Sequence, residues 1–141
     1  MKKVFVDTNI IVDLLADRRP HSKFAIELFK KAERNEVELF TSSHSIATSH
    51  YLLKKYIDEK QLRSILLSLL DYVTVVPIDQ ESLIKGLRSK HKDFEDALQM
   101  LAAESVNNML CIVTRNIKDF KLARVKVVGP DEAISTLCTW H

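Results

Sequence analysis

Carboxylates at the ends of apolar segments are the residues of this sequence whose type and position could do chemistry. The first, Asp7, follows the apolar residues 4–6 and precedes apolar residues at helical spacing over 9–16. An acid therefore stands where a buried strand ends and a helix begins. In an open parallel α/β sheet, ligands bind outside the carboxyl ends of the strands. The alternative is that Asp7 or Thr8 only caps the helix.

Further polar side chains lie near the ends of later segments. Asp93 and Asp96 are three residues apart at the start of an expected helix, so they share a helical face. Thr114, Asn116 and Asp119 follow the most apolar strand. Each acid also has an ordinary explanation, as a partner of the helix dipole or as a solvated side chain. If they converge in one crevice, however, they repel one another without a cation, and hard oxygen ligands suit Mg²⁺ or Mn²⁺.

The elements that must position these acids alternate along the chain. Apolar and β-branched runs predict strands over residues 4–6, 37–40, 73–76, 109–113 and 125–128. Apolar stripes predict helices over 9–16, 21–35, 45–56, 62–70, 80–89, 93–103 and 131–137. Capping is expected from the hydroxyl cluster at 41–43 and from Asp58 and Asp79, whereas Pro20 is placed to open a helix. This alternation predicts an α/β fold with three layers, in which helices cover both faces of a mainly parallel central sheet.

Length and composition limit the class of protein. The 141 residues are expected to form a single domain over 1–141, and 46% apolar with 28% charged residues is a globular balance. The longest apolar runs are too short to cross a bilayer, and the chain enters a strand at once, so no signal peptide is expected. Cys111 and Cys138 have no metal-ligand spacing and are interpreted as buried free thiols in a reducing cytosol, which indicates a cytoplasmic protein.

Three short motifs, in this order, resemble the PIN domain family. They are an apolar strand ending in Asp-Thr-Asn at 7–9, an Asp-x-x-Asp-Ala segment at 93–97 that opens a helix, and Thr-Arg-Asn-x-x-Asp-Phe at 114–120 after an apolar strand. The resemblance covers essentially the whole chain. It implies a metal-dependent ribonuclease of the kind found as VapC-type toxins in toxin–antitoxin pairs.

The resemblance also implies roles for individual residues. Asp7 becomes the first metal-binding acid, with Asn9 supporting it, and Asp96 the central acid, with Asp93 close by. The last acidic position falls on Asn116 or Asp119; many relatives carry Asp where Asn116 stands. The expected catalytic residues are Asp7, Asp93, Asp96 and Asp119. The expected ligands of Mg²⁺ or Mn²⁺ are Asp7, Asp96, Asp119 and Asn116. The expected substrate-binding residues are Asn9, Thr48, Thr114 and Arg115.

One position departs from the family pattern. Relatives usually carry a Glu on the helix after the second strand, and here that position falls near Thr48, in a segment without an acid. Another residue then substitutes, or metal affinity is lowered, or activity is lost. His44 and His50 are six residues apart and so do not share a helical face; surface or capping roles are the alternative for both.

The expected function is metal-dependent hydrolysis of RNA phosphodiester bonds, with RNA and an antitoxin protein as partners and a homodimer implied by the resemblance. The alternative is a catalytically impaired PIN-like module that binds RNA or a protein. A receiver-type or phosphoryl-transfer domain is disfavoured because no lysine-bearing strand end is apparent. Basic residues should surround the acids and hold the nucleic-acid backbone, with Arg115 preferred because it lies at a strand end; the other candidates are Arg18, Arg19, Lys54, Lys55, Arg88, Lys90, Lys92 and Lys118.

Overall fold

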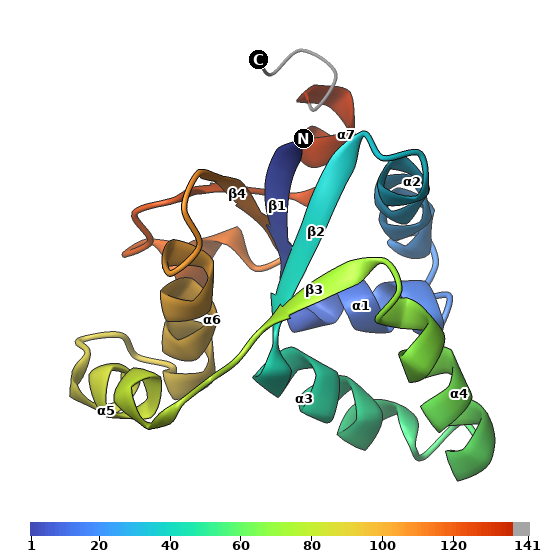
Figure 1. Ribbon diagram of the computed structural model, residues 1–141, viewed down its shortest axis with the longest axis horizontal. Helices are drawn as coiled ribbons and strands as arrows, with labels where there is room; N and C mark the ends of the chain where they lie inside the picture. Colours follow the sequence, from blue (N-terminus) through green and yellow to red (C-terminus); the bar gives the residue numbers. More distant parts are fainter. Residues whose placement is uncertain (137–141) are drawn as a thin grey trace.

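A five-stranded parallel sheet forms the centre of the protein in the computed structural model, which describes residues 1–136 (Figure 1). The strand order is β3-β2-β1-β4-β5. Every neighbouring pair is parallel, which confirms the expected sheet. The strands are β1 (Lys2–Val6), β2 (Val37–Ser42), β3 (Val73–Val76), β4 (Met109–Val113) and β5 (Lys126–Val128).

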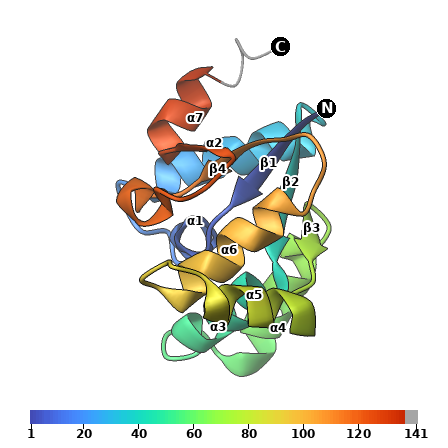
Figure 2. The ribbon, with the colours of Figure 1, turned by 90° about the vertical axis from the view of Figure 1, so that its left-hand side faces the viewer.

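Helices cover both faces of this sheet, as Figures 1 and 2 show. Successive side chains of a strand point to opposite faces, so Val4 and Val6 pack in one apolar cluster and Phe5 in the other. The first cluster is closed by α1, α2, α3, α4 and α7, and the second by α6 and the 3₁₀ helix η1. The helices are α1 (Thr8–Leu15), α2 (Ser22–Glu33), α3 (Ser43–Leu53), α4 (Glu59–Leu69), α5 (Gln80–Arg88), α6 (Phe94–Glu104), η1 (Ile117–Phe120) and α7 (Pro130–Thr136).

Most element boundaries follow from local caps. Ser42, Asp58 and Asp79 each accept a hydrogen bond from the backbone N–H three residues on, which confirms the expected capping. The second strand runs two residues further than expected, to Ser42, because Thr41 and Ser42 pair with β3. Pro20 does not open a helix: α2 begins at Ser22.

Two expectations concern the cysteines and the membrane. Cys111 is a buried free thiol, as expected, whereas Cys138 and the predicted last helical residue, Leu137, lie outside the described residues. Within residues 1–136, no helix has the length and apolarity needed to cross a membrane.

The order of the strands creates a crevice between β1 and β4. The chain moves from β1 through β2 to β3 on one side and from β4 to β5 on the other, so the direction of winding reverses beside β1. Here the backbone N–H of Asp7 donates to the carbonyl of Val113 at 3.0 Å, which holds the two strand ends together. Ligands of open α/β sheets bind at such a reversal.

Candidate active site

Asp7 is a buried carboxylate at the bottom of this crevice. Its side chain accepts a hydrogen bond from the backbone N–H of Thr8 at 2.8 Å, so it does cap α1. It is only 6% exposed and nevertheless lines a surface pocket. The role of Asp7 as a helix cap is therefore compatible with a role in the pocket.

Three side chains fix the Asp7 carboxylate, two of them from segments distant in the sequence. Gln99 Nε2 donates to Oδ1 at 2.9 Å, and Thr114 Oγ1 donates to Oδ2 at 2.8 Å. Asn9 Nδ2 reaches Oδ2 at 3.4 Å and Thr114 Oγ1 at 3.3 Å. The supporting role expected for Asn9 is thus matched by its contacts.

Thr114 corrects one expectation. It is fully buried, so it cannot contact a nucleic acid as the expected substrate-binding residue. Its hydroxyl instead orients Asp7 and accepts the backbone N–H of Asn116 at 3.1 Å. Thr114 is a positioning residue because burial gives it no surface to offer a substrate.

Gln99 is a residue of the candidate site that the sequence alone did not reveal. It is 2% exposed, its Nε2 donates to Ser45 Oγ at 2.6 Å, and its Oε1 accepts from Ser42 Oγ. It therefore links the start of α3 to Asp7. The available signal was its position three residues after Asp96, on the same face of the helix.

Asp96 is the half-buried acid of α6. Burial is the largest cause that raises its pKa, followed by the charges of Asp93, Asp7 and Asp119, while His91 lowers it. Together they bring the pKa from 3.8 to about 7. The carboxylates are thus close enough to repel one another, as expected from their positions at strand and helix ends. A bound cation would relieve this repulsion.

Asp93 and Asp119 lie at the edge of this group. Asp93 caps α6, since its Oδ1 accepts from the backbone N–H of Asp96 at 3.0 Å. Asp119 is exposed, and its backbone carbonyl accepts from His91 Nε2 at 2.6 Å. Of the two candidates for the last position, Asn116 lines the pocket and Asp119 acts on Asp96 through its charge.

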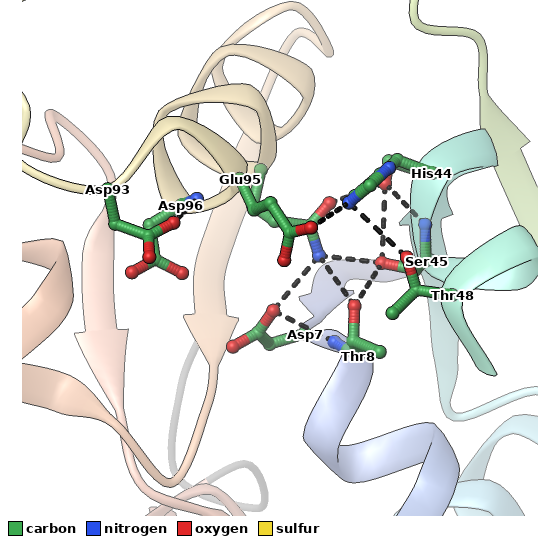
Figure 3. Close-up of polar contacts among 10 residues, drawn as sticks. Asp7, Thr8, His44, Ser45, Thr48, Asp93, Glu95 and Asp96 are labelled. Carbon is green, nitrogen blue, oxygen red and sulfur yellow. Dashed lines mark hydrogen bonds and ion pairs between the residues drawn. The ribbon is translucent and has the colours of Figure 1, made fainter. Parts of the chain in front are cut away.

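The pocket has a volume of about 220 Å³ and is formed mainly by α1, α3 and α6. Thr48 faces it, as expected, and so does Glu95, which the sequence analysis did not consider. Figure 3 shows the Glu95 side chain extending from α6 toward His44 and Thr48 of α3. The lining residues are Asp7, Thr8, Asn9, Val12, Arg18, His44, Thr48, Leu52, Glu95, Asp96, Gln99 and Asn116.

The two histidines of α3 lie on different faces of the helix, as their six-residue separation predicts. His44 faces the pocket and lies 3.4 Å from Glu95 Oε1. His50 pairs instead with Glu59 of α4 at 2.6 Å. His50 is therefore no substitute for the missing acid.

Arg115 is not directed at the pocket. Its Nε and Nη2 donate to the two oxygens of Asp13 at 2.6 and 3.1 Å, and Asp13 is 1% exposed. This contact favours a structural role over the expected contact with RNA. The basic residue that lines the pocket is Arg18.

The donor set fits a hard divalent cation. Asp7, Asp96, Glu95 and Asn116 offer carboxylate and amide oxygens, and the pocket contains no thiol. In the described part of the chain, no three such side chains have converged around a single point. Binding would therefore require the more exposed carboxylates to rotate toward Asp7, whose position is fixed.

Comparisons with known proteins agree with this geometry. The family model of the PIN domain matches residues 3–118, which include Asp7, Asp96 and Asn116. Ribonuclease VapC1 of Aquifex aeolicus is 30% identical over 136 residues, covering 93% of this chain and 92% of the relative.

Solved structures show the same fold. A toxin–antitoxin complex from Klebsiella pneumoniae contains a chain that is 27% identical, with a TM-score of 0.62 and coverage of 90% of this chain and 97% of that one. VapBC2 from Rickettsia felis, bound to a promoter DNA fragment, matches at 20% identity with a TM-score of 0.65, covering 90% and 98%. At that identity the second likeness concerns the fold alone.

Proposed function

The chain belongs to the PIN domain family, and from this premise we propose that it is a Mg²⁺- or Mn²⁺-dependent endoribonuclease acting at the Asp7 pocket. The observation that carries the proposal is that a fixed, buried Asp7 shares one pocket with Asp96, whose pKa is raised by burial and by the neighbouring carboxylates. A VapC ribonuclease that is 30% identical over 93% of this chain supports the same activity.

Asp7 and Asp96 would hold the cation, together with Asn116 or Asp119. The chemistry that a divalent ion would supply there is activation of a water and stabilisation of charge on the phosphate. Thr114, Asn9 and Gln99 keep the Asp7 carboxylate in place, since their hydrogen bonds to it come from α1, from α6 and from the segment after β4. Preorganised ligands of this kind need little rearrangement when the charge of the transition state develops.

RNA would approach from the open side of the pocket. Arg18 is exposed and lines the pocket, so its guanidinium could pair with a phosphate. We assign to Arg18 the role that the sequence suggested for Arg115, because Asp13 already occupies the Arg115 guanidinium.

The biological role we propose is that of a cytoplasmic toxin that is neutralised by an antitoxin protein and that, as its family resemblance implies, forms a homodimer. The Klebsiella pneumoniae chain, which is 27% identical, comes from a toxin–antitoxin complex. The VapC1 relative supports the same class.

Cleavage of a single-stranded RNA during a Mn²⁺ titration tests the activity. We expect cleavage that depends on Mn²⁺ or Mg²⁺ and stops with a chelator. The absence of an acid on α3 favours the alternative of an impaired module that only binds RNA or protein. RNA binding without cleavage at saturating metal would establish that alternative and overturn the nuclease.

A further inference from the structure

We propose that Glu95 supplies, from α6, the carboxylate that the metal pocket lacks on α3. This inference rests on the proposed metal-dependent function and assigns a ligand within it. The residues of α3, Ser43–Leu53, include no acid, so nothing on that helix can place negative charge in the pocket.

Glu95 reaches across the pocket to the wall that lacks an acid. Its Oε1 lies 3.4 Å from His44 Nε2, and Thr48 Oγ1 lies 3.3 Å from the same nitrogen. His44 and Thr48 are four residues apart, so both project from one face of α3. Glu95 therefore meets α3 at His44, one turn before Thr48, the position where the sequence pattern expects a Glu.

The alternative source of a carboxylate is Asp93, which also precedes Asp96. Asp93 is engaged as the cap of α6, with Oδ1 3.0 Å from the backbone N–H of Asp96, and it does not line the pocket. Glu95 does line it, together with Asp7 and Asp96. The cap holds Asp93 at the helix end, whereas the Glu95 side chain extends over the pocket to His44.

A more ordinary role for Glu95 also exists. It lies in the first turn of α6, where an acid is stabilised by the helix dipole, and its largely exposed side chain forms an ion pair with His44. The dipole alone does not explain why the side chain turns toward α3 (Figure 3). The two roles differ in what they predict for metal affinity.

Calorimetric titration of Mn²⁺ into the protein, without RNA, separates a ligand role for Glu95 from the ordinary role of an ion-pair partner. Glu95→Gln removes the charge and keeps the shape, and we expect Mn²⁺ affinity to fall by roughly tenfold or more, because affinity for hard cations follows the number of charged ligands. The matched control is Glu59→Gln, which breaks the corresponding pair with His50 away from the pocket. The control should leave Mn²⁺ affinity unchanged.

His44→Gln tests whether Glu95 acts only through its ion pair. If Glu95 is a ligand, removing His44 should leave Mn²⁺ affinity unchanged or raise it, since the imidazole no longer competes for the carboxylate. A loss equal to that of Glu95→Gln would instead make the ion pair the functional feature and overturn the assignment.

Restoring the acid on α3 gives a positive test. Thr48→Glu should tighten Mn²⁺ binding in the parent protein and recover most of the affinity lost in Glu95→Gln. Failure to recover it would show that Thr48 and Glu95 do not serve the same ion, against the proposal.

Asp7→Asn separates the assignment of Glu95 from the proposed metal pocket itself. If Asp7→Asn weakens Mn²⁺ binding and Glu95→Gln does not, the Glu95 assignment is wrong while the proposed function stands. If neither variant changes the affinity, the metal pocket itself is misassigned.

Discussion

Asp7 illustrates at the residue scale how one side chain can serve both structure and function. Its Oδ1 accepts the backbone N–H of Thr8 and the amide of Gln99, and its Oδ2 accepts the hydroxyl of Thr114. These bonds restrict the carboxylate to one orientation, yet it still lines the pocket. Helix capping therefore contributes to the placement of the proposed ligand.

Asp7→Asn should abolish cleavage while the fold persists. The amide keeps the shape and one acceptor oxygen, but it loses the negative charge that a hard cation requires. RNA cleavage should fall to background and Mn²⁺ affinity by roughly tenfold or more. Circular dichroism provides the control for folding. Unchanged cleavage in a folded variant would contradict the mechanism.

Asp96→Asn should alter the pH dependence of stability in metal-free protein. Its pKa is raised from 3.8 to about 7, so between these values the folded protein retains a proton that the unfolded chain has lost. Stability therefore falls as pH rises through this window, and the penalty is fully present above it. The variant has no such charge.

Urea unfolding in the presence of a chelator would measure this effect. At about pH 8 the variant should be more stable than the parent, and the difference should shrink toward about pH 4, where the parent carboxyl is neutral in both states. A difference in stability that does not change with pH would show that folding does not raise the pKa of Asp96.

At the element scale, the acids depend on contacts between segments that follow different strands. Arg115, after β4, binds Asp13 on α1, and Thr114 binds Asp7 at the start of the same helix. His91 in turn joins the start of α6 to η1, because its Nε2 donates to the carbonyl of Asp119. The pocket is therefore held by ties between α1, α6 and the segment after β4.

Arg115→Ala should destabilise the protein and leave RNA binding largely intact. The substitution leaves the Asp13 carboxylate, which is 1% exposed, without its cation. Removing one partner of a buried ion pair costs on the order of 3 kcal/mol, which denaturant unfolding can measure. Adding Asp13→Asn to the variant should recover part of the loss. An undiminished stability, with a weaker salt dependence of RNA binding, would return Arg115 to the substrate site.

At the scale of the whole molecule, the positions of the charged residues matter more than the net charge. The formal net charge is only +2, so long-range attraction of RNA by the whole protein is weak. A basic side chain beside the acidic pocket matters more, because it can pair with a phosphate next to the site of cleavage. Arg18 is the basic residue in the lining of that pocket.

Arg18→Ala should weaken RNA binding and flatten its dependence on salt. Each phosphate contact with single-stranded nucleic acid contributes about 0.7 to the slope of log affinity against log salt concentration. Fluorescence anisotropy with the Asp7→Asn variant, which should not cleave, would measure this slope. Arg19→Ala is the control, since Arg19 is exposed and pairs with Asp17. Equal effects of the two substitutions would indicate only a general loss of charge.

The sequence by itself determined the features that depend on neighbouring residues. Alternating strands and helices, the caps at Ser42, Asp58 and Asp79, and the acids Asp7 and Asp96 at element ends could all be predicted. Periodicity and capping are local, and parallel strands bring their carboxyl ends to one edge of the sheet. The general position of the pocket follows from these facts.

Only the tertiary structure decided which side chains meet there. Gln99 binds Asp7 across 92 residues, Thr114 across 107, and Arg115 reaches Asp13 across 102. Local sequence patterns cannot reveal such pairs, because strand order and helix packing decide which distant residues come into contact. For the same reason the sequence showed that α3 lacks an acid, but only the tertiary structure showed that Glu95, at the start of α6, lies beside His44 of α3 and lines the same pocket as Thr48.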